Sequence, residues 1–139
     1  MNLPDTVRTY LDRQQLSYRL IPYSSNEAIS QARERLDIPA RRIARAVLLK
    51  DATGPIMAIL PHSHILDFSM LCQVRKSDLE PLHGVETNRF FQGRGCKGNA
   101  HPPLPAAFGL PALVDTSLSD DGDIYFESGS GDCFVRMRG

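Results

Sequence analysis

The chain has 139 residues, a length typical of one domain with a single hydrophobic core. Its sixteen basic and sixteen acidic residues balance, which excludes a strong overall positive charge as the basis of nucleic-acid binding and leaves only local basic patches. Three widely spaced cysteines argue against a disulfide framework. No signal peptide and no run of about 20 apolar residues is visible, so we expect a cytoplasmic protein without a membrane anchor.

The N-terminal third predicts helices and one strand. Val7, Tyr10 and Leu11 recur at helical spacing, and polar and apolar residues alternate around Leu20. The elements expected here are a helix over Pro4–Gln15, a strand over Ser17–Tyr23, a helix over Glu27–Leu36 capped by Ser25 or Asn26, and a helical turn at Ile38–Ala40.

A hairpin is predicted at the centre of the chain. Two apolar runs, Ala46–Leu49 and Ile56–Leu60, flank the turn residues Asp51–Pro55. Neither run alternates with polar residues, so we expect the hairpin to be covered on both faces, at the centre of a sheet or barrel. Asp67 then predicts the N-cap of a short helix that carries Met70.

The remaining residues are rich in strand and turn signals. The elements expected are a short strand within Val74–Leu82, a helix over Val85–Gln92, a loop over Gly93–Pro111, a buried strand at Ala112–Val114, and strands at Ile124–Phe126 and Cys133–Met137 that form a hairpin. The whole pattern predicts one α+β or mixed α/β domain.

Three local patterns suggest chemistry that the sequence does not complete. His62 and His64 would share one face of a strand, as a metal pair needs, but no third ligand is indicated. Cys96 lies between Arg94 and Lys97, where a lowered thiol pKa is conceivable, but no base partner is specified. The glycine-rich segment Gly93–Gly98 neither follows a clear strand nor opens a clear helix, so it does not fit a phosphate-binding loop.

The order of the elements and motifs resembles the YbaK/EbsC family of aminoacyl-tRNA deacylases, which is related to the editing domain of some bacterial prolyl-tRNA synthetases. The resemblance covers essentially the whole chain, and each motif is weak alone. The residues that carry it are Pro61, Leu66, Asp67 and Leu71 after the hairpin, the GxxxP loop Gly98–Pro102, the segment Leu110–Asp115 and the turn Ser128–Gly131.

The resemblance implies a single YbaK-like domain over residues 1–139, with a barrel-like mixed β-sheet flanked by helices and a pocket between the central hairpin and the GxxxP loop. It implies hydrolysis of the ester bond of mischarged aminoacyl-tRNA by a free-standing domain, without a metal or another cofactor. The expected partners are the acceptor end of aminoacyl-tRNA and an aminoacyl-tRNA synthetase. An ester has an acceptable leaving group, so a positioned water and oriented N–H donors could suffice.

Three residues are the candidates for catalysis. Arg45 stands where the family has a lysine; it keeps the charge, but arginine and lysine are not interchangeable at a tightly fitted site. Lys50 cannot replace it, because an odd offset on a strand points to the other face. Gly98 would let the loop backbone approach the substrate, and His101 could donate to the ester or assist the attacking water. The alternatives are an Arg45 in a decayed site and an exposed His101 without a role.

Six further residues are the candidates for substrate binding. Pro102 would stiffen the loop, and Asp67 could line the pocket besides capping its helix. The basic residues Arg41, Arg42, Arg94 and Lys97 could surround the pocket mouth and contact acceptor-stem phosphates, although Arg41 and Arg42 also fit a solvated helix face. The rival function is a non-catalytic module that binds an aminoacyl-adenosine-like ligand, tRNA or a partner domain. The amino acid removed stays open.

Overall fold

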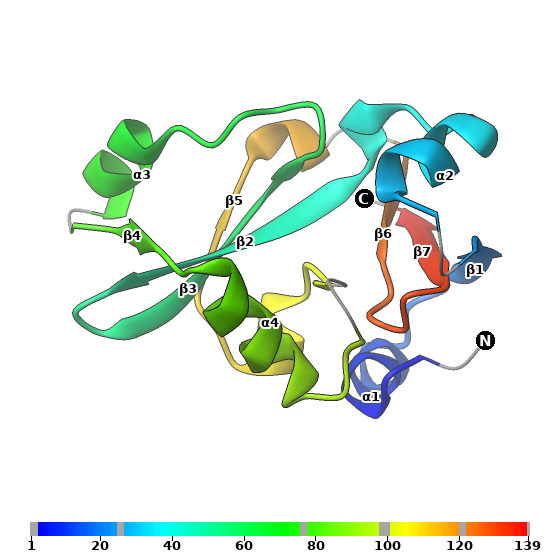
Figure 1. Ribbon diagram of the computed structural model, residues 1–139, viewed down its shortest axis with the longest axis horizontal. Helices are drawn as coiled ribbons and strands as arrows, with labels where there is room; N and C mark the ends of the chain where they lie inside the picture. Colours follow the sequence, from blue (N-terminus) through cyan, green and yellow to red (C-terminus); the bar gives the residue numbers. More distant parts are fainter. Residues whose placement is uncertain (1–2, 25–26, 76–77, 98–100, 120–121, 139) are drawn as a thin grey trace.

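Two β-sheets and the helices around them make up the fold (Figure 1). The computed structural model describes residues 3–24, 27–75, 78–97, 101–119 and 122–138. One sheet has the strand order β4-β2-β3-β5 and the other the order β1-β7-β6. The strands are β1 (Arg19–Pro22), β2 (Ala44–Asp51), β3 (Gly54–Pro61), β4 (Glu80–Pro81), β5 (Ala112–Val114), β6 (Asp123–Glu127) and β7 (Cys133–Arg138).

The predicted central hairpin is confirmed. β2 and β3 pair antiparallel from Ala44 opposite Pro61 to Asp51 opposite Gly54, and together they occupy the middle of their sheet. The connection is shorter than predicted, because the strands extend to Asp51 and Gly54. The side chain of Asp51 accepts hydrogen bonds from the backbone and the hydroxyl of Thr53 and so closes this turn.

Both faces of the hairpin are covered, as its unbroken apolar runs predict. Leu48 and Met57 belong to the largest hydrophobic cluster. Residues from both the N-terminal and the C-terminal part of the chain contribute to this cluster. Leu49 and Ile56 belong to a separate cluster, together with Leu79. Side chains of neighbouring strand positions point to opposite faces, so each strand contributes to two cores at once.

The C-terminal hairpin, also predicted, forms the second sheet. β6 and β7 pair antiparallel from Asp123 opposite Arg138 to Glu127 opposite Phe134, and β1 adds to the other edge of β7. A parallel bridge between Ile43 and Tyr125 connects β6 to the start of β2. This bridge joins the two sheets, so the strands form the mixed, barrel-like arrangement that the sequence predicts.

Four α-helices and three short 3₁₀ helices lie around the strands in the described part of the chain. They are α1 (Asp5–Arg13), α2 (Ile29–Arg35), α3 (Phe68–Arg75), α4 (Gly84–Gln92), and the 3₁₀ segments Ala40–Arg42, Pro105–Phe108 and Thr116–Ser119. Asp67 caps α3 as predicted, because its carboxylate accepts a hydrogen bond from the Met70 N–H at 3.1 Å. None of these helices has the length and apolar character that crossing a bilayer requires.

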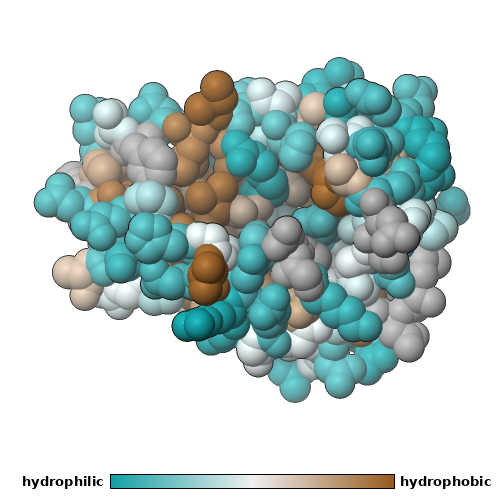
Figure 2. Space-filling model, viewed as in Figure 1, coloured by the Kyte–Doolittle hydropathy of each residue, from teal (hydrophilic) through white to brown (hydrophobic). Residues whose placement is uncertain are grey.

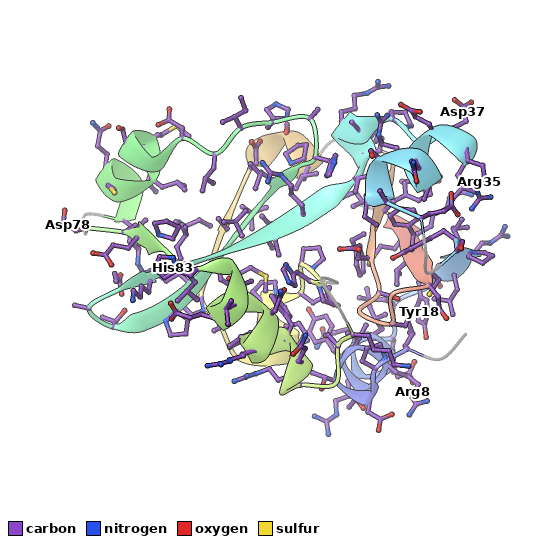
Figure 3. All side chains as sticks on the ribbon, viewed as in Figure 1. Arg8, Tyr18, Arg35, Asp37, Asp78 and His83 are labelled. Atoms are coloured by element: carbon purple, nitrogen blue, oxygen red, sulfur yellow. The ribbon has the colours of Figure 1, made fainter. Side chains whose placement is uncertain are left out.

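The start of α2 differs from the prediction. The helix begins at Ile29 with Ala28 as its N-cap, and the expected caps Ser25 and Asn26 lie outside the described residues. Glu27 stays outside the helix because its side chain accepts a hydrogen bond from the Ser24 N–H and pairs with Arg35. Figure 3 shows Arg35 on the outer side of α2.

Strand β5 was expected to be buried, and this expectation is wrong. Ala112 and Val114 are exposed, and Val114 keeps 58% of its surface accessible. β5 pairs in parallel with β3 on one side only, at the edge of its sheet, so one long side of the strand has no neighbouring strand. The predicted loop over Gly93–Pro111 also contains the short 3₁₀ helix at Pro105–Phe108.

A packed junction attaches the segment before β5 to the turn between β6 and β7. Gly129 has a φ of +96°, and a Cβ atom there would lie 2.9 Å from Pro102 Cγ and 3.0 Å from both Cys96 Sγ and Pro4 Cγ. The Lys97 N–H donates a hydrogen bond to the Gly129 carbonyl at 2.8 Å. Only glycine fits here, because both the backbone angle and the close approach exclude a side chain.

We predict that Gly129→Ala lowers the free energy of unfolding by about 2–4 kcal/mol, from backbone strain and overpacking together. Gly109→Ala is the matched control, because Gly109 has a φ of +67° but nothing within 4 Å of an added Cβ. Its loss should be about 1–2 kcal/mol from strain alone. Urea unfolding measures both variants, and equal losses would contradict the packing at Gly129.

Candidate functional site

A pocket of about 110 Å³ opens where β2 and β6 separate. Beyond the bridge between Ile43 and Tyr125, Arg45 and Glu127 each lie two residues further along their parallel strands. Residues two apart on a strand share a face, so both side chains extend into the same wedge. The pocket is lined by Arg45, His62, His101 and Glu127 and by apolar residues that include Ile29 and Ile43.

In the Arg45 side chain, one nitrogen has a hydrogen-bond partner and another has none among the described residues. Its Nη2 donates a hydrogen bond to the backbone carbonyl of His64 at 2.7 Å, which fixes the side chain against the turn after β3. Its Nε is buried and has no hydrogen-bond partner in the described part of the chain. A buried donor without a partner is costly, so the side chain is held here at some expense of stability.

His101 is not the exposed loop histidine considered as an alternative. Its ring stacks on Phe91 at a centroid distance of 4.7 Å, and its Nε2 lies 2.7 Å from Asn88 Oδ1. Burial lowers the pKa of His101, so the imidazole is neutral at pH 7. If Nε2–H donates to the Asn88 oxygen, Nδ1 carries a lone pair and can accept a proton.

Glu127 was missed by the sequence analysis. Burial raises the pKa of its carboxyl group to about 7, even though the His101 backbone N–H and the Tyr23 hydroxyl both donate hydrogen bonds to it. The only sequence signal was an acidic residue directly after an apolar strand, Ile124–Phe126, where a solvated strand end is the ordinary interpretation. Its place in the pocket depends on the parallel bridge, which the sequence does not indicate.

Of the predicted catalytic residues, the pocket brings together Arg45 and His101, and Gly98 lies outside the described residues. Pro102 is buried against the Gly129 junction. Asp67 lies on a different hollow, described below.

The four other basic residues do not line the pocket. Arg41 and Arg42 belong to the 3₁₀ turn just before β2, and the Arg42 guanidinium lies against Gly122. The Arg94 guanidinium lies 3.7 Å from the centroid of the Phe90 ring and donates to the Phe90 carbonyl. Lys97 is exposed beside the β6–β7 turn.

The histidine pair and the cysteine do not form the sites that their spacing suggested. His62 and His64 lie in the turn after β3, so the strand geometry assumed for a metal pair is absent. In the segments that the structure describes, no group of three or more His, Cys, Asp or Glu side chains could hold a metal ion. Cys96 belongs to the core, and burial raises the pKa of its thiol to about 11, which keeps it protonated at neutral pH.

A larger hollow of about 330 Å³ lies between α3, the segment before it and β5. Figure 2 shows a hydrophobic band in this region. Its lining is apolar except for Asp67 and Asp115. The smaller pocket is the better candidate for chemistry, because it holds a cation, a carboxyl group and a neutral imidazole together.

We predict that Glu127→Gln changes how the stability of the protein depends on pH. The folded state holds the Glu127 proton up to about pH 7, whereas an ordinary glutamate releases it near 4.5. A raised folded pKa means that stability decreases as the pH rises between these values. The variant should therefore gain about 1–3 kcal/mol relative to wild type on going from pH 4 to pH 8.

Urea unfolding at both pH values measures this difference. Glu86→Gln, at an exposed position of α4, is the matched control and should follow the wild type at each pH. If the free energy of unfolding of Glu127→Gln and of wild type changed equally between the two pH values, the raised pKa of Glu127 would be contradicted.

Comparison with known proteins gives the family of the chain. The aminoacyl-tRNA editing domain family matches residues 24–139. No curated protein is similar enough to count as a relative. A provisionally assigned signal transduction protein from Marinobacter aquaeolei VT8 has 25% sequence identity and a TM-score of 0.78 over 99% of this chain. This chain spans only 27% of that longer protein.

Two further solved structures share the fold. The hypothetical protein APE2540 is 17% identical, with a TM-score of 0.79 over 95% of this chain and 87% of its own. A provisionally assigned trans-editing enzyme for prolyl-tRNA synthetase is 16% identical, with a TM-score of 0.73 over 97% of this chain and 87% of its own. The family match covers most of the sequence, and the mixed α/β fold agrees with it. The chain belongs to the aminoacyl-tRNA editing domain family, the YbaK family.

Proposed function

We propose that this domain hydrolyses the ester bond of mischarged aminoacyl-tRNA in trans. The family supports a role in tRNA editing. The observation that carries the catalytic part of the proposal is the convergence of Arg45 and His101, from distant parts of the sequence, on one small pocket. The proposed partners are the acceptor end of aminoacyl-tRNA in the cytoplasm and, for delivery, an aminoacyl-tRNA synthetase.

Arg45 would stabilise the negative charge that develops on the ester. In the proposed reaction, water attacks the carbonyl carbon and the carbonyl oxygen becomes an oxyanion. The Arg45 guanidinium lines the pocket and would donate to that oxygen, and its orientation is already fixed by the Nη2 bond to the His64 carbonyl. A donor that needs no reorganisation is worth more in the transition state than a mobile one.

His101 would move the proton. A neutral imidazole can take a proton from the attacking water and give it to the departing ribose oxygen as the acyl C–O bond breaks. The products are a free amino acid and a tRNA with a free terminal hydroxyl. The lowered pKa of His101 supports this role, because only the unprotonated ring can act as the base.

The size of the pocket favours a small amino acid. Its volume of about 110 Å³ is well below that of a typical small-molecule site. Alanyl, seryl and cysteinyl groups are therefore the first substrates to test.

A non-catalytic module is the second candidate function, and the state of Arg45 favours it. The family lysine is replaced here, and Nη2 of Arg45 is already engaged by the His64 carbonyl. A guanidinium held in this way can still bind an ester or phosphate oxygen without promoting its hydrolysis.

We predict that Arg45→Ala lowers the deacylation rate constant by about 10²–10³-fold, the usual effect of removing a donor to an oxyanion. The assay is single-turnover hydrolysis of alanyl-, cysteinyl-, seryl- and prolyl-tRNA. Arg45→Lys tests whether charge alone suffices, and Arg13→Ala, at an exposed arginine of α1, is the control. Undiminished hydrolysis by Arg45→Ala would assign the chemistry to the Gly98–Pro102 loop. If the wild type hydrolyses none of these substrates, the hydrolytic function is refuted and the non-catalytic binding module becomes the proposed function.

We also predict that tRNA binding weakens steeply with salt. Arg41 and Lys97 are exposed and belong to segments that adjoin β2 and the β6–β7 turn. If each contacts one phosphate, the double variant Arg41→Ala/Lys97→Ala should lower the slope of log K against log salt by about 2. Filter binding between 50 and 200 mM salt measures it, and an unchanged slope would exclude these residues from the tRNA interface.

A further inference from the structure

The pocket between β2 and β6 carries a donor and an acceptor that do not bind each other. The buried Nε of Arg45 has no hydrogen-bond partner, and the carboxyl group of Glu127 lines the same small space. The ion pairs in the described part of the chain join other residues and do not include this pair. The two residues therefore bring a hydrogen-bond donor and a hydrogen-bond acceptor to the same pocket.

Among the residues that the structure describes, Glu127 has no positively charged partner although it is largely buried. Its two partners are the backbone N–H of His101 and the Tyr23 hydroxyl at 3.5 Å, and both are neutral. A carboxylate can accept about four hydrogen bonds, so acceptor positions remain. Buried carboxylates are normally paired with a cation, because an uncompensated charge in the interior is costly. This site is therefore complementary to a cationic donor from a ligand.

An aminoacyl ester offers the matching pair of groups. Its carbonyl oxygen is an acceptor, and its α-ammonium group is a cationic donor one carbon atom away. An ester of a hydroxy acid or of an N-acylated amino acid keeps the acceptor but lacks the cation. The acyl group also adds bulk beside the amino acid in a pocket of only about 110 Å³.

We propose that Glu127 binds the α-ammonium group of the substrate while the Arg45 guanidinium binds its ester carbonyl oxygen. This inference rests on the proposed function. It makes Glu127 the residue that restricts the site to esters of free α-amino acids. N-acylated aminoacyl-tRNA and peptidyl-tRNA are then excluded, so the domain removes amino acids before, and not after, they enter a peptide.

The test compares alanyl-tRNA with N-acetyl-alanyl-tRNA of the same tRNA. Wild type should prefer the free amine by about 10- to 100-fold in kcat/KM, the effect expected for one charge-assisted hydrogen bond. Glu127→Gln keeps the shape and the bond from the His101 N–H but removes the charge. It should lose this preference, mainly through a higher KM for alanyl-tRNA, since the ammonium contact exists in both the bound and the transition states.

Two further variants keep the test specific. Glu127→Asp retains the charge and should retain part of the preference, whereas a merely structural role would make it the more damaging change. Glu86→Gln, on the exposed face of α4, should behave as wild type. Equal hydrolysis of both esters by wild type, or a preference that survives in Glu127→Gln, would overturn the inference while leaving the hydrolytic function intact.

A binding measurement separates this inference from the proposed function. The probes are 3′-alanylamino-3′-deoxyadenosine, in which an amide replaces the ester, and its N-acetyl form, titrated calorimetrically. If wild type hydrolyses no ester, the hydrolytic function fails. At least tenfold weaker binding of the acetylated probe, lost in Glu127→Gln, would still support the role of Glu127. Equal binding of the two probes would refute it.

Discussion

One backbone bridge, between Ile43 and Tyr125, determines the geometry on which the site depends. It holds the start of β2 against β6 and so joins two sheets that otherwise share no strand. Because the pairing is parallel and stops after this bridge, the strands separate with Arg45 and Glu127 on facing positions. The pocket is thus a consequence of how the sheets are connected, and its lining residues come from both of them.

The loop that carries His101 is held by the core on two sides. Its ring stacks on Phe91, a fully buried residue of α4, and the neighbouring Pro102 packs against Gly129. Cys96 meets the same glycine. A residue whose position is determined by stacking and close packing keeps its orientation without a ligand, which is the condition for preorganised chemistry. Core packing and site geometry are therefore coupled in this domain.

The site departs from the rule that buried polar groups are satisfied, as does the Nε of Arg33 outside it. An unpartnered Arg45 Nε and a buried Glu127 carboxyl group both reduce stability in the free protein. Proteins retain such groups where a ligand completes them. Arg45 fits this pattern, because its Nη2 is anchored to the His64 carbonyl while its buried Nε has no partner among the described residues.

The sequence by itself determined the two hairpins, the N-cap at Asp67 and the family, because these depend on local apolar patterns, turn residues and their order. It also proposed Arg45 and His101. It did not predict that Glu127 lines the pocket or that β5 is exposed. It also did not predict that Pro102 and Arg94 lie outside the pocket. Those outcomes depend on which strands become neighbours and which edges stay open, and residues far apart in the chain set them. Local patterns indicate whether a side chain is on the buried or the exposed face of its element. Only the tertiary structure determines which other residues that face contacts.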